Sequence, residues 1–210
     1  MNSTLSPVVI DLLETLTRRV PLISVTQLKV LWQISSRDRR VLGRRLSRLH
    51  AAGLLDVHTI NAQVLNPAGP LFAWRPGGDE PDAVALAHRS QTRWQFPAAP
   101  TTVCVASRLT ANLFGSTSTG LPKLDHRHHD LLLAAAYVFY RLRRPKEATM
   151  WVGEHALPKA GFRIKDPDAF LIDSQNQVLR VIESAGRYRP CQIESFHEHC
   201  ADEGLPYELW

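Results

Sequence analysis

Arginines that recur every three or four residues form the clearest chemical pattern in this sequence. If Ser35 to Ala52 is one helix, Arg37, Arg40, Arg44 and Arg48 lie on one face, and Leu42, Leu46 and Leu49 lie on the opposite face. A guanidinium fork donates two parallel hydrogen bonds to phosphate oxygens or to the guanine edge. A solvent-exposed amphipathic helix is the alternative, but such helices usually mix acids among their cations, and this segment has only Asp38. The pattern therefore predicts a helix that binds DNA through Arg37, Arg40, Arg44, Arg45 and Arg48.

A second group of residues could bind a metal ion and hydrolyse a phosphodiester. Asp168 follows Pro167 at the start of one apolar run, and Glu183 ends the next. Two such carboxylates can bind Mg²⁺, which acidifies a water molecule, while a lysine stabilises the transition state. The lysine is missing, because the position two residues after Glu183 is Ala185. The nearest cation on the same strand face is Arg187, whose guanidinium does not readily give up a proton. We expect no Mg²⁺-dependent cleavage, and the two acids are either polar strand ends or a weak metal site.

The elements that must position the arginines lie in the first 77 residues. Ser6-Pro7 indicates the start of a first helix, and a short second helix is expected from Ser24 to Trp32. Gly53 is expected to end the arginine helix. Val57–Ile60 and Leu71–Gly77 then predict a strand and its return strand in one hairpin.

The elements that must position the two acids begin near residue 125. A buried helix is expected over Leu131–Arg143, and the runs Ala169–Ile172 and Val178–Ile182 are apolar enough to be central strands. The predicted order is completed by a short strand at 150–152, a helix at about 190–203 and a last strand at 207–210.

The string from Arg44 to Leu55 resembles the recognition helix and wing entry of bacterial winged helix-turn-helix proteins, over roughly residues 8–77. In that family the third helix enters the major groove and the hairpin wing touches the DNA backbone, which implies a phosphate contact for Arg75. Residues 125–210 resemble the PD-(D/E)xK nuclease superfamily, on Pro167-Asp168 and Glu183, and the resemblance implies that Glu154 is the helix-side acid. Together the two halves resemble the replication-relaxation type proteins of plasmids and other mobile elements.

The net charge of +5 lies entirely in the first part of the chain, because residues 1–93 carry 12 basic and 7 acidic side chains and the remainder carries 13 of each. A basic module joined to a neutral one indicates that the first half binds a polyanion. We therefore expect an α+β protein with a winged-helix domain at 1–77, an irregular linker at 78–124 and a degenerate nuclease-like α/β domain at 125–210. We expect residues 1–77 to fold and bind DNA alone.

Other patterns limit the alternatives. Asp11 and Glu14 interrupt the first apolar stretch, so no secretory signal is expected, and no apolar run is long enough for a membrane span. Three scattered cysteines are typical of free thiols, which indicates a cytoplasmic protein. If the protein binds DNA, we expect it to associate with the nucleoid or a plasmid. The histidines at 126–129 and the Cys/His residues at 191–200 lack zinc-ligand spacing, and no motif for a small-molecule substrate is present.

These patterns favour a double-stranded DNA-binding protein that forms a possible homodimer and requires no cofactor. Two rivals stay open. One is an active Mg²⁺-dependent nuclease with a relocated cation, and the other is a protein-interaction adaptor that does not bind DNA.

Overall fold

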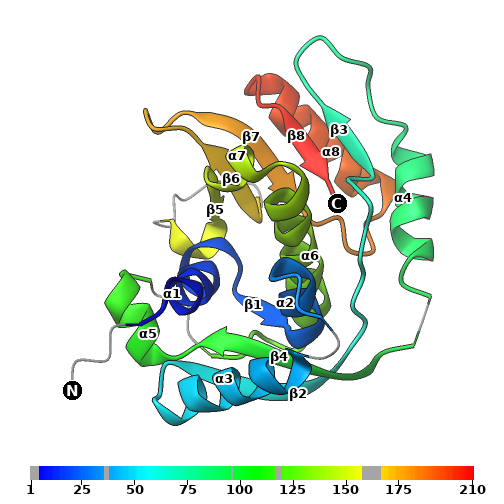
Figure 1. Cartoon of the computed structure of the whole chain (residues 1–210). Helices are drawn as coiled ribbons and strands as arrows, with labels where there is room; N and C mark the ends of the chain where they lie inside the picture. The colour runs from blue at the N-terminus through cyan, green and yellow to red at the C-terminus, as the bar shows by residue number, and fades with distance from the viewer. Residues whose placement is uncertain (1–4, 36–37, 96, 117–119, 158–166) are drawn as a thin grey trace.

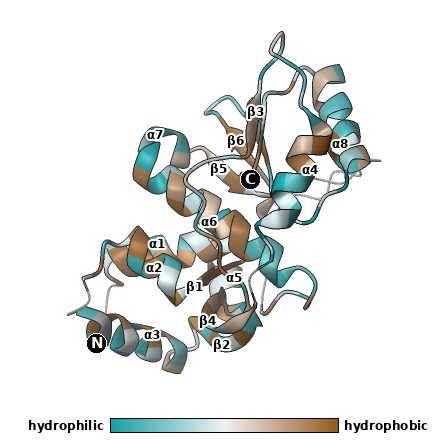
Figure 2. Cartoon of the chain, turned by 90° about the vertical axis from the view of Figure 1, so that its right-hand side faces the viewer, coloured by the Kyte–Doolittle hydropathy of each residue, from teal (hydrophilic) through white to brown (hydrophobic). Residues whose placement is uncertain are grey.

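The computed structural model describes residues 5–35, 38–95, 97–116, 120–157 and 167–210, and across these ranges the fold is mixed α+β, as predicted. Two sheets lie on either side of a long helix, α6 (Arg127–Arg143), as Figure 1 shows. Figure 2 shows the same division as two lobes with α6 between them. We call the lobe that contains α1, α2 and α3 the first lobe and the other the second lobe.

The first lobe is built on an antiparallel sheet in the order β1-β4-β2. Its strands are β1 (Leu22–Ser24), β2 (Leu55–Ala62) and β4 (Ala99–Ala106). Its helices are α1 (Pro7–Glu14) with a π-helical turn at Thr15–Arg19, α2 (Val25–Leu31), α3 (Arg39–Ala51) and α5 (Arg108–Phe114). Ser24 and Gln27 form a capping box at the start of α2. Gly53, with a φ of 68°, terminates α3 in the left-handed conformation that glycine favours.

The second lobe is built on a sheet in the order β3-β8-β7-β6-β5, in which β7 and β8 are parallel and the other neighbours antiparallel. Its strands are β3 (Phe72–Trp74), β5 (Trp151–Gly153), β6 (Ala169–Ile172), β7 (Val178–Glu183) and β8 (Tyr207–Leu209). Its helices are α4 (Ala83–Thr92), α7 (Pro145–Ala148), α8 (Pro190–Asp202) and a 3₁₀ turn at Glu154–Ala156. The prediction that β6 and β7 are central strands is confirmed.

The predicted hairpin between β2 and the segment at residues 71–77 is wrong. The partner of β2 is β4, with Val57 across from Cys104, whereas β3 pairs with β8 in the second lobe. Aromatic packing accounts for the position of β3, because the rings of Trp74 and Tyr207 stack at 5.7 Å. The division into two sheets therefore does not coincide with the domain boundary expected at residue 77, because β3 precedes that boundary and belongs to the second sheet. A strand from the expected linker lies at the centre of the first sheet.

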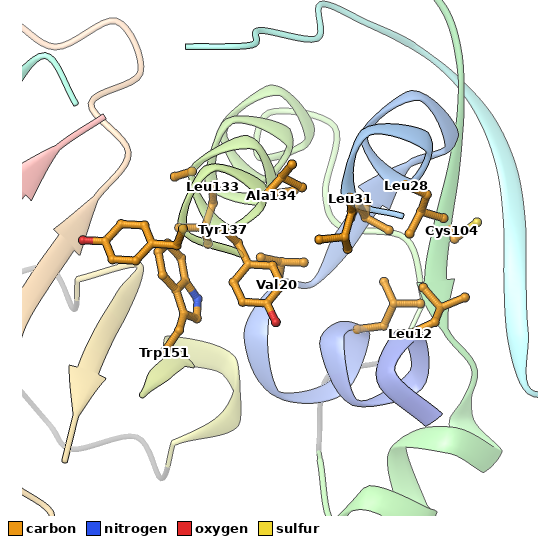
Figure 3. Close-up of a cluster of buried hydrophobic side chains, with 14 of the residues drawn as sticks. Leu12, Val20, Leu28, Leu31, Cys104, Leu133, Ala134, Tyr137 and Trp151 are labelled. Atoms are coloured by element: carbon orange, nitrogen blue, oxygen red, sulfur yellow. The ribbon is translucent and has the colours of Figure 1, made fainter. Parts of the chain in front are cut away.

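One hydrophobic core crosses the two lobes. It joins Leu12 and Leu28 of the first lobe to Tyr137 of α6 and to Trp151 and Trp210 of the second. Figure 3 shows Leu12, Leu28, Tyr137 and Trp151 converging on this core from separate elements. Helix α6 is buried on nearly all sides, as its sequence predicted, because it packs against α2 and β1 as well as the second sheet. Within the described ranges, no helix has the length and apolar character needed to cross a membrane.

Candidate functional site

Helix α3 divides into an apolar face and a cationic face, as its sequence predicted. Leu42, Leu46 and Leu49 are buried against the first lobe. The opposite face carries the exposed side chains of Arg40, Arg44 and Arg48 and the half-buried side chain of Arg45. Within the described part of the chain, none of these four guanidinium groups forms an ion pair with a carboxylate. Arg37 lies outside the described residues.

The C-terminal end of α3 is fixed to the sheet by several hydrogen bonds. The Ser107 hydroxyl donates to the carbonyl oxygen of Gly53 at 2.6 Å, and the Thr110 hydroxyl donates to that of Leu54. His50 Nδ1 lies 3.0 Å from the carbonyl oxygen of Leu55. Because these contacts hold α3 at the outer edge of the first lobe (Figures 1 and 2), its arginine face is presented to solvent on a rigid support.

Arg75 does not join this surface. It is exposed and directly follows β3, which belongs to the second sheet and lies at the far end of the molecule from α3 in Figure 1. The expected wing position of Arg75 depended on a hairpin with β2, and that hairpin is absent from the described sheets.

Four acidic residues of the second half line a cavity of about 390 Å³. The cavity lies where the start of α6 meets β6 and the turn after β5. Its polar lining residues are Asp125, His126, His129, Asp130, Glu154, His155 and Asp168, and Pro21 and Leu133 complete the wall. We call this cavity the acidic pocket.

Asp168 is the most firmly held acid of the pocket. Its Oδ2 accepts a hydrogen bond of 2.6 Å from the Ser184 backbone N–H and lies 2.9 Å from His129 Nε2. The ring nitrogen Nδ1 of His129 is 3.2 Å from Asp130 Oδ1. Glu154 reaches this site through its backbone, whose N–H donates to the Asp168 carbonyl oxygen at 2.9 Å, while its side chain is exposed.

Glu183 stands next to Asp168 in the sheet but has different partners. Ala169 pairs with Ile182, so Asp168 and Glu183 occupy the next opposed positions. Glu183 is buried and accepts a hydrogen bond from the Tyr188 hydroxyl, and it does not line the acidic pocket. Burial and the adjacent Glu183 carboxylate raise the pKa of Tyr188.

Within the described ranges, the cation that a nuclease would need is not found near these acids. Ala185 is buried, with 1% of its surface exposed, so no charged side chain occupies the lysine position. Arg187 points elsewhere, because its guanidinium donates to the Trp94 carbonyl oxygen at 3.1 Å. Among the described residues, no three His, Cys, Asp or Glu side chains are arranged to hold a metal ion. The described residues therefore do not form the Mg²⁺ site that the nuclease resemblance implies.

Two histidines of the pocket are shifted in opposite directions. Burial disfavours a charge on His129, but Asp168 and Asp130 outweigh that effect and raise its pKa to about 10. Burial lowers the pKa of His155 to about 4, and its Nε2 has no hydrogen-bond partner among the described residues. Gly153 allows His155 to pack there, because a Cβ at that position would lie 2.6 Å from the imidazole ring.

The sequence interpretation assigned no role to His129 or Asp130. Asp130 lies three and seven residues before Leu133 and Tyr137, on the buried face of a helix that is apolar from Leu131 onward. An acid at such a position requires a partner, because burying an unpaired charge is costly. That position is the sequence signal that could have identified the pair.

These opposite shifts predict a stability maximum near pH 6.5, the ordinary pKa of histidine. Because the pKa of His129 is raised, its contribution is complete below pH 6.5 and is lost as the pH rises toward about 10. Because the pKa of His155 is lowered, stability is lost as the pH falls from 6.5 toward about 4. In urea titrations, His129→Gln is expected to remove about 2 kcal/mol of the decline in unfolding free energy between pH 6.5 and about 9. An unchanged alkaline slope in this variant would contradict the assignment of charge to His129.

The chain matches no protein-family profile, and comparisons with curated proteins and with solved structures give no match either.

Proposed function

We propose that this protein binds double-stranded DNA through the arginine face of α3. The observation that carries the proposal is the exposure of Arg40, Arg44 and Arg48 on one side of a rigid helix whose leucines are buried. The 13 residues of α3 span about 20 Å, which suits the major groove. Arginines without carboxylate partners are available for phosphate and guanine contacts.

The order of the elements supports a winged-helix assignment for the first lobe. Three helices are followed by strands that complete an antiparallel sheet, in the order β1-β4-β2, behind the helix pair α2 and α3. The position of the hairpin wing is taken by residues 63–98, which supply β3 and α4 to the second lobe. DNA contacts are therefore expected from α3 rather than from a wing.

For the second lobe, the succession α6-β5-β6-β7-α8-β8 supports the nuclease-like assignment. The proposed role is structural or in partner docking, since the acidic pocket does not fit a metal site. Replication or maintenance of a plasmid or other mobile element is the context that the resemblance suggests.

The test is binding of a short labelled duplex by fluorescence anisotropy over a range of salt concentrations. The double variant Arg44→Ala/Arg48→Ala is expected to bind at least about tenfold more weakly, and the slope of log affinity against log salt is expected to be shallower by about two. Each lost phosphate contact removes counterion release, which is the reason for the change in slope.

The matched control is Arg75→Ala/Arg89→Ala, which removes the same charge from exposed positions outside α3. It is expected to leave both affinity and slope nearly unchanged. An equal loss in both double variants would indicate nonspecific attraction by net charge, and absence of salt-dependent binding by the unmodified protein would favour the adaptor.

A further inference from the structure

The geometry points to His129 as a built-in cation that occupies the space between Asp130 and Asp168 and excludes a divalent metal ion from the acidic pocket. Its two ring nitrogens lie 3.2 Å from Asp130 Oδ1 and 2.9 Å from Asp168 Oδ2. The contact with Asp168 has an ion-pair distance and is not an aligned hydrogen bond, so charge is the deciding factor: a buried carboxylate on each side of the ring favours the form in which both nitrogens carry a proton. The side chain is then an imidazolium.

The surrounding structure fixes this arrangement at the junction of α6, β6 and β7. Ser184 holds both partners, because its backbone N–H donates to Asp168 at 2.6 Å and its hydroxyl donates to the His129 carbonyl oxygen at 3.3 Å. Asp130 and Asp168 are both buried, with 8% and 7% of their surface exposed. Two carboxylates so poorly hydrated need a cation between them.

Within the described ranges, the remaining charged groups around the pocket do not supply that cation. Asp125 adds negative charge, and His126 lies 3.9 Å from Asp125 rather than between the buried acids. His155 stays neutral because of burial. Removing the His129 imidazole therefore leaves the Asp130 and Asp168 carboxylates, with Asp125 nearby, around a partly open cavity. Carboxylate oxygens in such a cavity are the donors that Mg²⁺ and Mn²⁺ prefer.

The experiment measures binding of Mn²⁺ alone to the full chain by calorimetry, with thermal unfolding in parallel. The unmodified protein is expected to give no saturable binding up to about 1 mM. His129→Ala is expected to gain one saturable site at least about tenfold tighter than any site in the unmodified protein, and Mn²⁺ is expected to raise its midpoint of unfolding. His129→Ala/Asp168→Asn is expected to lose the new site. The matched control is His126→Ala, which also removes a pocket histidine and is expected to behave as the unmodified protein does.

Two results would overturn the inference: Asp168-dependent Mn²⁺ binding by the unmodified protein, or a folded His129→Ala that binds no Mn²⁺. Because the alanine variant could lose its fold, the charge is also measured directly in the unmodified protein. At pH 8 the ring ¹⁵N resonances of His129 are expected to have imidazolium values for both nitrogens, and a neutral tautomer would refute the inference. Neither measurement involves DNA, so the result is separate from that of the α3 proposal.

Discussion

Residues 1–77 expressed alone are expected to be unfolded, although their helix and strand patterns suggested an independent domain. In the structure β1 and β2 do not pair with each other, because β4 lies between them and pairs with both. The fragment also lacks α6, which packs against α2 and β1. Without β4 and α6, the leucines of the first helices lose most of the surface that covers them, and three short helices with isolated strands are marginal in water.

The measurement is far-ultraviolet circular dichroism with urea titration. The fragment is expected to give no cooperative transition, and the full chain is expected to give one. Mixing residues 1–77 with a separate chain of residues 78–210 provides the control, because the second piece supplies β4 and α6 in trans and is expected to restore helical signal. A cooperative transition in residues 1–77 by themselves would show that the lobe has an independent core.

Glu208→Ala is expected to lower the free energy of unfolding by about 3–5 kcal/mol. The Glu208 carboxylate is 2% exposed and receives hydrogen bonds from the Tyr140 hydroxyl at 2.9 Å, from Trp210 Nε1 at 3.0 Å and from Arg144 at 2.6 Å. Arg180 lies 3.3 Å from it as well. Removing the acid leaves the guanidinium groups of Arg144 and Arg180 close together without the carboxylate that they share. Glu147, which contacts Arg180, stays in place. The large cost follows from leaving partly buried charges uncompensated.

The measurement is the free energy of unfolding in urea, compared between Glu208→Ala and the control variant Glu203→Ala. Glu203 is exposed, near the end of the helix that precedes β8, and its loss is expected to change stability by less than about 0.5 kcal/mol. Similar values for the two variants would mean that the Glu208 network contributes little. Tyr140→Phe removes one hydrogen bond to the same carboxylate, together with the contacts that its hydroxyl accepts from Arg144 and Arg180, and leaves the acid in place. It is expected to fall between the two variants, at about 1–2 kcal/mol.

Local patterns predicted much of this fold. The alternation of leucine and arginine along α3 follows from helical geometry alone, and the burial of Leu42 and Leu46 agrees with it. The apolar runs of β6 and β7 identified them as central strands because a strand covered on both faces needs no polar side. These features depend on residues that are close in sequence.

Pairing between distant segments could not be predicted in the same way. Residues 99–106 begin with Ala99 and Pro100 and contain two threonines, so they resembled a linker, yet they form the central strand of the first sheet. The choice between β3 and β4 as the partner of β2 is decided by what each strand packs against. In β3, the Phe72 ring packs against the Tyr207 ring. In β4, Val103 and Val105 are buried in a hydrophobic cluster with Leu131.

The candidate sites divide in the same way. The sequence identified Asp168 and Glu183 and the absence of a lysine at Ala185, all of which are local properties of two strands. It did not identify His129, whose importance depends on the approach of α6 to Asp168 from a segment about 40 residues earlier in the chain. Electrostatic partners of this kind become visible only when the helix is placed beside the sheet.

The path of residues 63–98 has a consequence for synthesis of the protein on the ribosome. The chain leaves the first lobe after β2, contributes β3 and α4 to the second lobe, and only then returns as β4. During translation β2 therefore has no neighbour in its sheet until residue 106 has left the exit tunnel, and β3 waits for β8, about 130 residues later in the chain. Contacts between such distant segments form slowly, because long loops must close first. We therefore expect the nascent chain to carry unpaired strand edges for much of its synthesis, and edges of this kind are prone to pair with other chains until they are covered.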